Sequence, residues 1–149
     1  MLQLQERREG NAKYRAGEYK SALKSYERAL SVVELVRGLS RGDQAEVDVN
    51  RIAVLCNIAA VHLATEEYGA AAEACTKALE LNPHCVKALM RRYKAYIGRH
   101  EYVGAMQDVK ALERMGEEVG ELLAAMKHAK KKDIKSEKST FGSMFDRQS

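Results

Sequence analysis

The side chains of this 149-residue chain that are best suited to chemistry are cations and amides spaced for a shared helix face. Arg7, Asn11 and Arg15 follow one another at four-residue intervals, and so do Lys87 and Arg91. Residues four apart lie on the same side of an α-helix, where two like charges cost about a few tenths of a kcal/mol. A local cost of this kind indicates a functional site, here one that binds negative charge.

Two further groups extend this set. Asn57 and Ala60 are three residues apart, and Met90 and Lys94 stand beside the Lys87–Arg91 pair. Across all of these positions cations and amides outnumber acids, so the faces that carry them would form an electropositive surface lined with hydrogen-bond donors. A surface with those properties suits an acidic, extended peptide.

Other kinds of chemistry find little support in the sequence. The cysteines lack the paired spacing of a zinc site or a disulfide framework, so we expect small core thiols in a reducing compartment; they are Cys56, Cys75 and Cys85. The four histidines are scattered, and no nucleophile–base set or glycine-rich phosphate loop is present. We therefore expect no metal, no cofactor and no catalysis by this chain.

Composition and charge narrow the class of protein. Hydrophobic residues make up 46% of the chain and proline occurs once, which favours helices. The net charge of +4 is mild for a nucleic-acid binder, and most of the surplus lies in residues 127–138. No apolar run approaches the roughly 20 residues of a membrane span, and the N-terminus lacks a signal-peptide core. We expect a cytoplasmic protein that binds neither membranes nor nucleic acids.

An internal repeat predicts the architecture. Tyr68 and Tyr102 are 34 residues apart, and Tyr19 precedes Tyr68 by 49 residues, which is the same period plus a 15-residue insertion. Each of these tyrosines is followed three residues later by an alanine, namely Ala22, Ala71 and Ala105. A 34-residue period with small residues between polar breaks is typical of tetratricopeptide repeats, which are pairs of antiparallel helices.

The repeat predicts an all-α fold of three tetratricopeptide repeats in a right-handed superhelix. Seven helices are expected, at about 2–16, 19–37, 46–65, 68–81, 84–98, 102–115 and 117–137. Repeat 1 spans about 3–37, an insertion 38–48, repeat 2 about 49–83 and repeat 3 about 84–116, together residues 1–116; a capping helix at 117–138 and a flexible tail at 139–149 follow. Tyr14, Tyr19, Tyr26, Tyr68 and Tyr102 are expected to be packing residues, and Arg92 and Arg99 ordinary surface charges.

The cations and amides at these repeat positions resemble the dicarboxylate clamp of tetratricopeptide-repeat co-chaperones. In that family a Lys/Asn pair, a second Asn and a Lys/Arg pair grip the C-terminal Glu-Glu-Val-Asp peptide of cytosolic heat-shock chaperones. The matching residues here are Arg7, Asn11, Asn57, Lys87 and Arg91. The departure is Arg7, where the family more often has lysine, so a planar fork replaces a point charge. Arg15, Ala60, Met90 and Lys94, which the repeat pattern places on the same groove-facing helices, are expected to make secondary contacts with the peptide.

The resemblance is closest to the immunophilin branch, the FKBP- and cyclophilin-type peptidyl-prolyl isomerases. It rests on a long second helix around residues 33–39, on Lys87-Ala88-Leu89-Met90-Arg91-Arg92, and on a basic last helix ending near Phe141-Gly142-Ser143-Met144-Phe145. It implies a co-chaperone module that binds heat-shock protein 90, with heat-shock protein 70 as a competing partner.

Two alternatives remain open at this point. The chain would be the C-terminal part of an isomerase whose catalytic domain is not in residues 1–149, or it would be a scaffold for another protein. The basic stretch at 127–138 is expected to be a solvated helix end, or else a calmodulin-binding segment.

Overall fold

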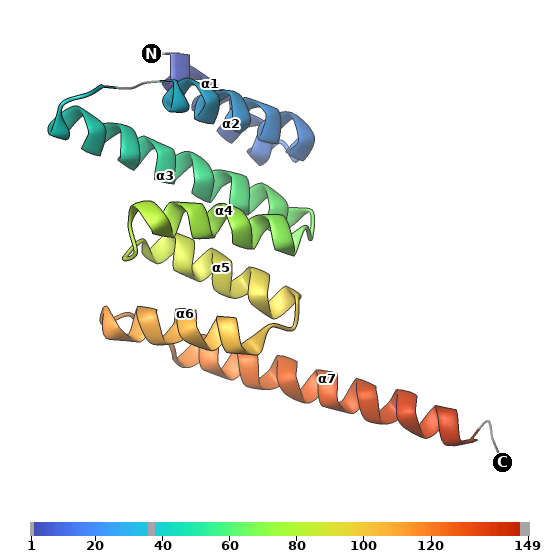
Figure 1. Ribbon diagram of the computed structural model, residues 1–149. Coiled ribbons are helices and arrows are strands. Elements are labelled where there is room, and N and C mark those ends of the chain that lie inside the picture. Colours follow the sequence, from blue (N-terminus) through green and yellow to red (C-terminus); the bar gives the residue numbers. More distant parts are fainter. Residues whose placement is uncertain (1, 36–37, 147–149) are drawn as a thin grey trace.

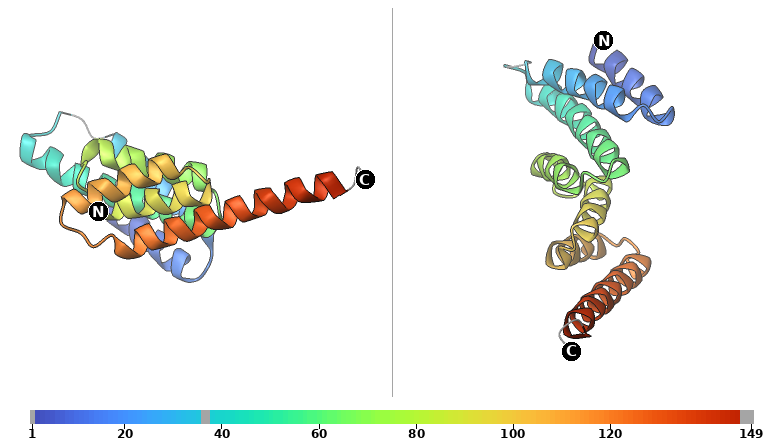
Figure 2. Two further views of the ribbon diagram at one scale, coloured as in Figure 1. Left: turned by 90° about the horizontal axis from the view of Figure 1, so that it is seen from below. Right: turned by 90° about the vertical axis from the view of Figure 1, so that its right-hand side faces the viewer.

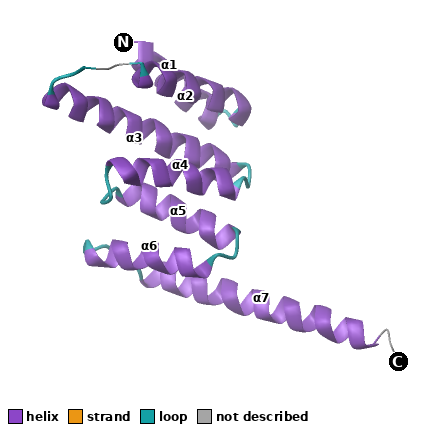
Figure 3. Cartoon of the chain, in the orientation of Figure 1, coloured by secondary structure: helices purple, strands orange, loops and turns teal. Residues whose placement is uncertain are grey.

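Seven α-helices make up the computed structural model, which describes residues 2–35 and 38–146, and these residues contain no strand (Figures 1 and 3). The helices are α1 (Leu2–Arg15), α2 (Tyr19–Glu34), α3 (Arg41–Ala64), α4 (Tyr68–Leu81), α5 (Val86–Gly98), α6 (Tyr102–Arg114) and α7 (Gly120–Asp146). The predicted all-helical fold is confirmed, and three of the seven predicted helices agree with the structure to within one residue at both ends.

The helices stack as three successive hairpins followed by α7 (Figure 1). α1 packs on α2, α3 on α4 and α5 on α6, while α2 contacts α3 and α4 contacts α5 to join neighbouring hairpins. The first helices of the hairpins also touch in the order α1, α3, α5. These three helices therefore line one side of the stack, on which residues distant in sequence come together. Three hairpins are consistent with three repeats, although the exact repeat boundaries stay a prediction.

The same turn closes each hairpin. Gly17, Glu66 and His100 adopt positive φ angles of 77°, 59° and 60°, directly after α1, α3 and α5. In each turn the next residue donates its backbone N–H to a carbonyl five residues earlier, as in Glu18 to Lys13, Glu67 to His62 and Glu101 to Tyr96. This left-handed cap ends a helix and satisfies its last carbonyls. The repeated turn places Tyr19, Tyr68 and Tyr102 at the same first position of the following helix.

Close packing within the first hairpin and between the second and third depends on glycines that face tyrosine rings. A Cβ atom built on Gly98 would lie 2.6 Å from the ring of Tyr68, and one on Gly10 would lie 2.5 Å from the ring of Tyr26. Because real Cβ atoms do not approach so closely, neither position has room for a side chain. The tyrosines are packing residues, as predicted, but they pack against backbone as well as against alanines such as Ala22 and Ala71.

A buried ion pair joins the two helices of the third hairpin. Asp108 of α6 is 1% exposed, and Arg92 of α5 donates to its carboxylate over 2.6–3.2 Å. Arg92 also donates to Thr76 of α4 and lies over the ring of Tyr96. The prediction that Arg92 is an ordinary surface charge is therefore wrong, because its position on α5 turns it toward α6. Arg99 is exposed and pairs with Glu101, as a surface charge does.

Four helices differ from their predicted boundaries by more than one residue. α2 ends at Glu34 rather than at 37, so it is shorter than the long second helix that the resemblance implied, and α5 and α7 begin at Val86 and Gly120 rather than at 84 and 117. α3 begins at Arg41, so most of the predicted insertion at 38–48 forms its first turns. Ser40 caps this helix by accepting from the backbone N–H of Asp43 and donating to its carboxylate, which favours helix over loop. At the other end, residues 139–146 continue α7 where a flexible tail was predicted; no proline interrupts the helix between the lysine-rich stretch at 127–138 and Asp146. Residues 36–37 and 147–149, which belonged to the predicted second helix and tail, lie outside the described residues.

The longest apolar helix belongs to the core. By length and composition alone, α3 would be able to cross a membrane. Its side chains Val54, Leu55, Ile58 and Val61 are instead buried in the cluster that joins the hairpins. The same helix carries Asn50 and Asn57 on another face, so its role in the structure is to connect the core with a polar surface.

Only the first part of α7 covers the stack. Met126 is 3% exposed, and Tyr93 of α5 donates from its hydroxyl to the backbone carbonyl of Leu122. Further along, Asp133 accepts from Tyr102 and lies 2.8 Å from His100 Nδ1, and these bonds lower the pKa of Asp133. Beyond this contact the helix projects from the stack (Figure 2). A calmodulin-binding role for its basic residues stays a prediction.

The fit between Gly98 and Tyr68 yields a stability prediction. We expect Gly98→Ala to lower the free energy of unfolding by about 1–3 kcal/mol, because the added methyl group would displace the Tyr68 ring. Gly69→Ala is the matched control, since only the mobile end of Arg99 lies near its Cβ position, at 3.4 Å. Urea denaturation followed by circular dichroism measures both, and a Gly98→Ala protein as stable as the Gly69→Ala protein would contradict this packing.

Candidate functional site

A small polar cavity lies where the first helices of the three hairpins approach one another. It encloses about 150 Å³, and its walls come from α1, α2, α3 and α5. The lining residues are Asn11, Tyr14, Arg15, Tyr26, Asn57, Ala60 and Arg91. Residues 80 positions apart in the sequence thus share one cavity with cations and amides in its wall.

One amide oxygen organises the floor of this cavity. The hydroxyl of Tyr26 donates to Asn11 Oδ1 over 2.6 Å, and Asn57 Nδ2 donates to the same oxygen over 3.2 Å. Both lone pairs of the Asn11 oxygen are therefore engaged, so that Asn11 has only its NH₂ group to offer a ligand. Asn57 keeps one N–H for the same purpose. The amides are oriented as donors before any ligand arrives.

Guanidinium groups provide the positive potential around these amides. Arg91 donates from one terminal nitrogen to the backbone carbonyl of Cys56 over 2.7 Å, which fixes the side chain of α5 against α3. Burial and the neighbouring Tyr14 raise the pKa of Tyr26, while the charges of Arg15, Arg91 and Arg7 oppose that rise. The field of all three arginines thus reaches the cavity, where it favours an anion.

The structure brings most of the predicted site residues together. Asn11, Arg15, Asn57, Ala60 and Arg91 line the cavity. The predicted secondary contacts Arg15 and Ala60 are therefore as central to its wall as the asparagines.

The remaining predicted residues lie around the cavity rather than in its wall. Arg7 lies one turn before Asn11 on α1, and its guanidinium donates to Asn50 of α3 over 3.2 Å. Lys87 is exposed on the first turn of α5, one turn before Arg91 on the same helix face. Met90 is half-buried against the core, and Lys94 is exposed three residues beyond Arg91.

Sequence reasoning missed three residues of this region. Tyr14 and Tyr26 were assigned to packing alone, and Asn50 was not singled out. The signal for Tyr26 was available, because a tyrosine in a core position usually needs a partner for its hydroxyl. Asn50 stands seven residues before Asn57, which is two helical turns, so it shares the polar face of α3 with Asn57.

The cysteines lie behind this surface. Cys56 and Cys75 are buried, and burial raises the pKa of each thiol to about 12. Cys85 is partly exposed just before α5 and packs against the same core. Neutral thiols of this kind are packing residues, and no cluster of potential metal ligands occurs among the described residues.

The helix pairs, the repeated turn and the polar cavity define a tetratricopeptide-repeat fold. Residues 52–85 match the family model described as tetratricopeptide repeat. Over 141 residues the chain is 29% identical to the peptidyl-prolyl cis-trans isomerase FKBP4 of Mus musculus, an alignment that covers 93% of this chain and 31% of that protein. The chain therefore spans about a third of the length of this relative, and the expected resemblance to FKBP-type isomerases is borne out as sequence similarity to this region of FKBP4.

Solved structures agree with this assignment. The Hsp90 co-chaperone Cns1 from Saccharomyces cerevisiae matches with a TM-score of 0.77 and 22% identity, over 99% of this chain and 45% of that chain. The myosin chaperone UNC-45 from C. elegans, solved in complex with a Hsp90 peptide, matches with a TM-score of 0.70 and 30% identity, over 93% of this chain and 15% of that chain. The first similarity shows the fold, and the second adds a higher sequence identity over 93% of this chain.

The burial of the thiols predicts their reactivity. At pH 8 a thiol with a pKa of about 12 is ionised in about one molecule in ten thousand, so Cys56 and Cys75 should react slowly with a thiol reagent in the folded protein. We expect one thiol, Cys85, to react promptly with Ellman's reagent, and all three to react in denaturant. The Cys85→Ser variant is the control, and none of its thiols should react promptly while it is folded. Prompt reaction of all three thiols in the folded wild-type protein, or of any thiol in the folded Cys85→Ser variant, would contradict this account.

Proposed function

We propose that this chain is the peptide-binding module of a co-chaperone and that it grips the acidic C-terminal tail of heat-shock protein 90. The observation that carries the proposal is the small donor-lined cavity formed by Asn11, Asn57, Arg15 and Arg91. The homology to FKBP4 and the likeness to UNC-45, which was solved with a Hsp90 peptide, support it. The Glu-Glu-Val-Asp sequence of the ligand comes from the family resemblance.

The mechanism is the recognition of two carboxylates on one residue. A terminal aspartate carries its side-chain carboxylate and the chain end, and the cavity offers amide N–H groups of Asn11 and Asn57 together with the guanidinium of Arg15. Hydrogen bonds to charged groups contribute about 1.5–3 kcal/mol each. Several of them, less the cost of ordering a short peptide, correspond to a micromolar complex of about −8 kcal/mol.

The residues of α5 extend the site along the peptide. Lys87 is exposed on the first turn, so it can meet a carboxylate without losing an internal partner. Arg91 keeps N–H groups beyond the one that binds the Cys56 carbonyl, and these can reach a peptide carbonyl or an upstream acid. Ala60 and Met90 offer apolar surface for the valine of the tail. Arg7 contributes its field, and its contact with Asn50 would be exchanged for the peptide.

A catalytic domain, where one exists, belongs outside this chain. FKBP4 is named as an isomerase, and the matched region is 31% of its length. We propose that residues 1–149 deliver such a domain to a chaperone and do not catalyse isomerisation themselves.

The role of the chain end gives the most direct test of this function. We expect a free-acid Glu-Glu-Val-Asp peptide to bind with micromolar affinity in calorimetry, and the same peptide with an amidated C-terminus to bind at least about tenfold more weakly, because one charged acceptor is lost. Equal affinities for the two peptides would show that the cavity does not bind the C-terminal carboxylate. That result would favour a scaffold that binds an internal segment of another protein.

Lys87 provides a clean mutational test, because the described structure gives its ammonium group no internal bond to break. We expect Lys87→Ala to weaken peptide binding by about tenfold or more while helix content stays unchanged. Lys77→Ala is the control; this lysine is exposed on α4 and pairs only with Glu73 one turn before it. If both variants lose affinity to the same degree, the effect is one of net charge and not of a specific contact.

A further inference from the structure

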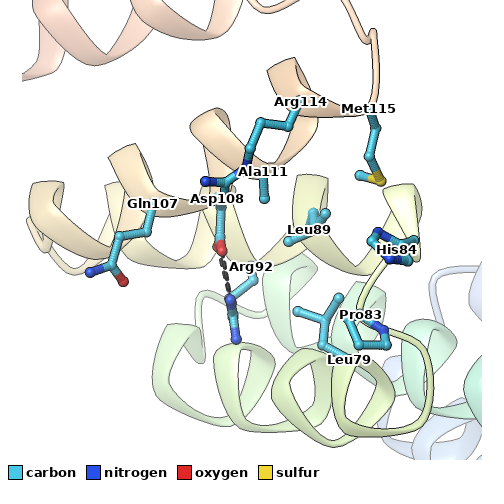
Figure 4. Close-up of a pocket in the computed structure, with 10 residues that line it drawn as sticks. All are labelled: Leu79, Pro83, His84, Leu89, Arg92, Gln107, Asp108, Ala111, Arg114 and Met115. Atoms are coloured by element: carbon cyan, nitrogen blue, oxygen red, sulfur yellow. Dashed lines mark hydrogen bonds and ion pairs between the residues drawn. The ribbon is translucent and has the colours of Figure 1, made fainter.

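A second cavity lies on the other side of α5, between α4, α6 and the loop that joins α4 to α5. It encloses about 500 Å³, a volume in the range of ligand-binding clefts. Figure 4 shows the Arg92–Asp108 pair on one side of this cavity and His84 and Met115 on the other. It shares no lining residue with the cavity of Asn11 and Asn57, so the two are separate sites.

α5 divides the two cavities. Arg91 points to the first cavity, where it bonds to the Cys56 carbonyl, and the adjacent Arg92 lines the second. Successive residues of a helix are rotated by about 100°, so neighbouring arginines serve different faces. Leu89 lines the second cavity as well, and together with Leu79 and Ala111 it provides an apolar wall.

The charges of the second cavity are one-sided. Among its lining residues the only carboxylate is that of Asp108, which is 1% exposed and already accepts three hydrogen bonds from Arg92. The cations that remain toward solvent are Arg114 and the outer edge of Arg92, while His84 lies on the opposite side of the cavity (Figure 4). A ligand entering the cavity therefore meets apolar walls below and positive charge at the rim.

We propose that this cavity is a second docking site, which takes an apolar side chain of a partner protein followed by an acidic residue. The wall of Leu79, Leu89 and Met115 accommodates a leucine-sized side chain, and Arg114 stands at the rim to receive the carboxylate. The buried Arg92–Asp108 pair holds α5 and α6 at a fixed separation, so the cavity exists before the partner binds. A partner with a basic residue in place of the acidic one is repelled by the same rim.

A blocked peptide tests the site without engaging the first cavity. The probe is Ala-Leu-Glu-Glu-Ala, acetylated and amidated, because it offers no free chain end. With the methionine methyl groups labelled with carbon-13, Met115 reports on the second cavity and Met90 on the first. In NMR spectra we expect the Met115 methyl signal to shift saturably at millimolar peptide concentrations, while the Met90 signal does not shift. The peptide with both glutamates changed to glutamine should bind about fivefold more weakly.

Two matched variants decide whether the rim makes a specific contact. Arg114→Glu should weaken the probe about fivefold or more, whereas Lys110→Glu should change it less than about twofold. Lys110 is exposed one turn earlier on the same helix and lies outside the cavity lining, so its variant changes net charge equally. A Met115 signal that does not respond, an equal response to the glutamine peptide, or equal losses for the two variants would overturn the proposal. Calorimetry with the free-acid Glu-Glu-Val-Asp peptide should be unaffected by Arg114→Glu, which keeps this test separate from that of the first cavity.

Discussion

The oxygen of one amide, that of Asn11, connects three helices and sets the character of the candidate site. It accepts from Tyr26 of α2 and from Asn57 of α3, while Asn11 itself belongs to α1. Because the oxygen is used inside the protein, the amide hydrogens are what remain for a ligand. A site that binds carboxylates must present donors without competing acceptors, and this arrangement achieves it with neutral side chains. The nearby arginines then add charge to a surface whose polarity is already fixed.

Internal hydrogen bonds also fix the position of α5. Its consecutive residues Arg91 and Arg92 are both held by oxygen atoms of neighbouring helices, the first by the Cys56 carbonyl of α3 and the second by Asp108 of α6. One bond ties the second hairpin to the third, and the other ties the third hairpin together. The helix is thereby positioned from both sides, and each of these faces lines a preformed cavity, the second of which is drawn in Figure 4. Preformed sites bind short peptides with a smaller entropic cost.

The sequence was sufficient for the fold because the 34-residue spacing and the small residues after Tyr19, Tyr68 and Tyr102 act locally and repeat. It also placed Asn11, Arg15, Asn57, Ala60 and Arg91 on one surface, since helical periodicity decides which face a side chain takes. The sequence did not predict which side chains contact one another across neighbouring helices. Nothing local distinguishes Arg92, which is half-buried in an ion pair with Asp108, from Arg99, which is exposed, and the role of the Tyr26 hydroxyl depends on a residue 15 positions away. Likewise the cap formed by Ser40 and Asp43, which was not predicted, starts α3 within a segment that was predicted to be a loop.

The most direct measurement of the central claim compares two tyrosines that line the same cavity. Tyr26 donates to Asn11, whereas no hydroxyl bond is found for Tyr14 within the described residues. In calorimetry with the free-acid Glu-Glu-Val-Asp peptide, Tyr26→Phe should lower the affinity by about fivefold, the value of one hydrogen bond that orients Asn11, and Tyr14→Phe should leave it unchanged. Wild-type affinity for Tyr26→Phe, or an equal loss in both variants, would contradict the view that the Asn11 oxygen organises the site.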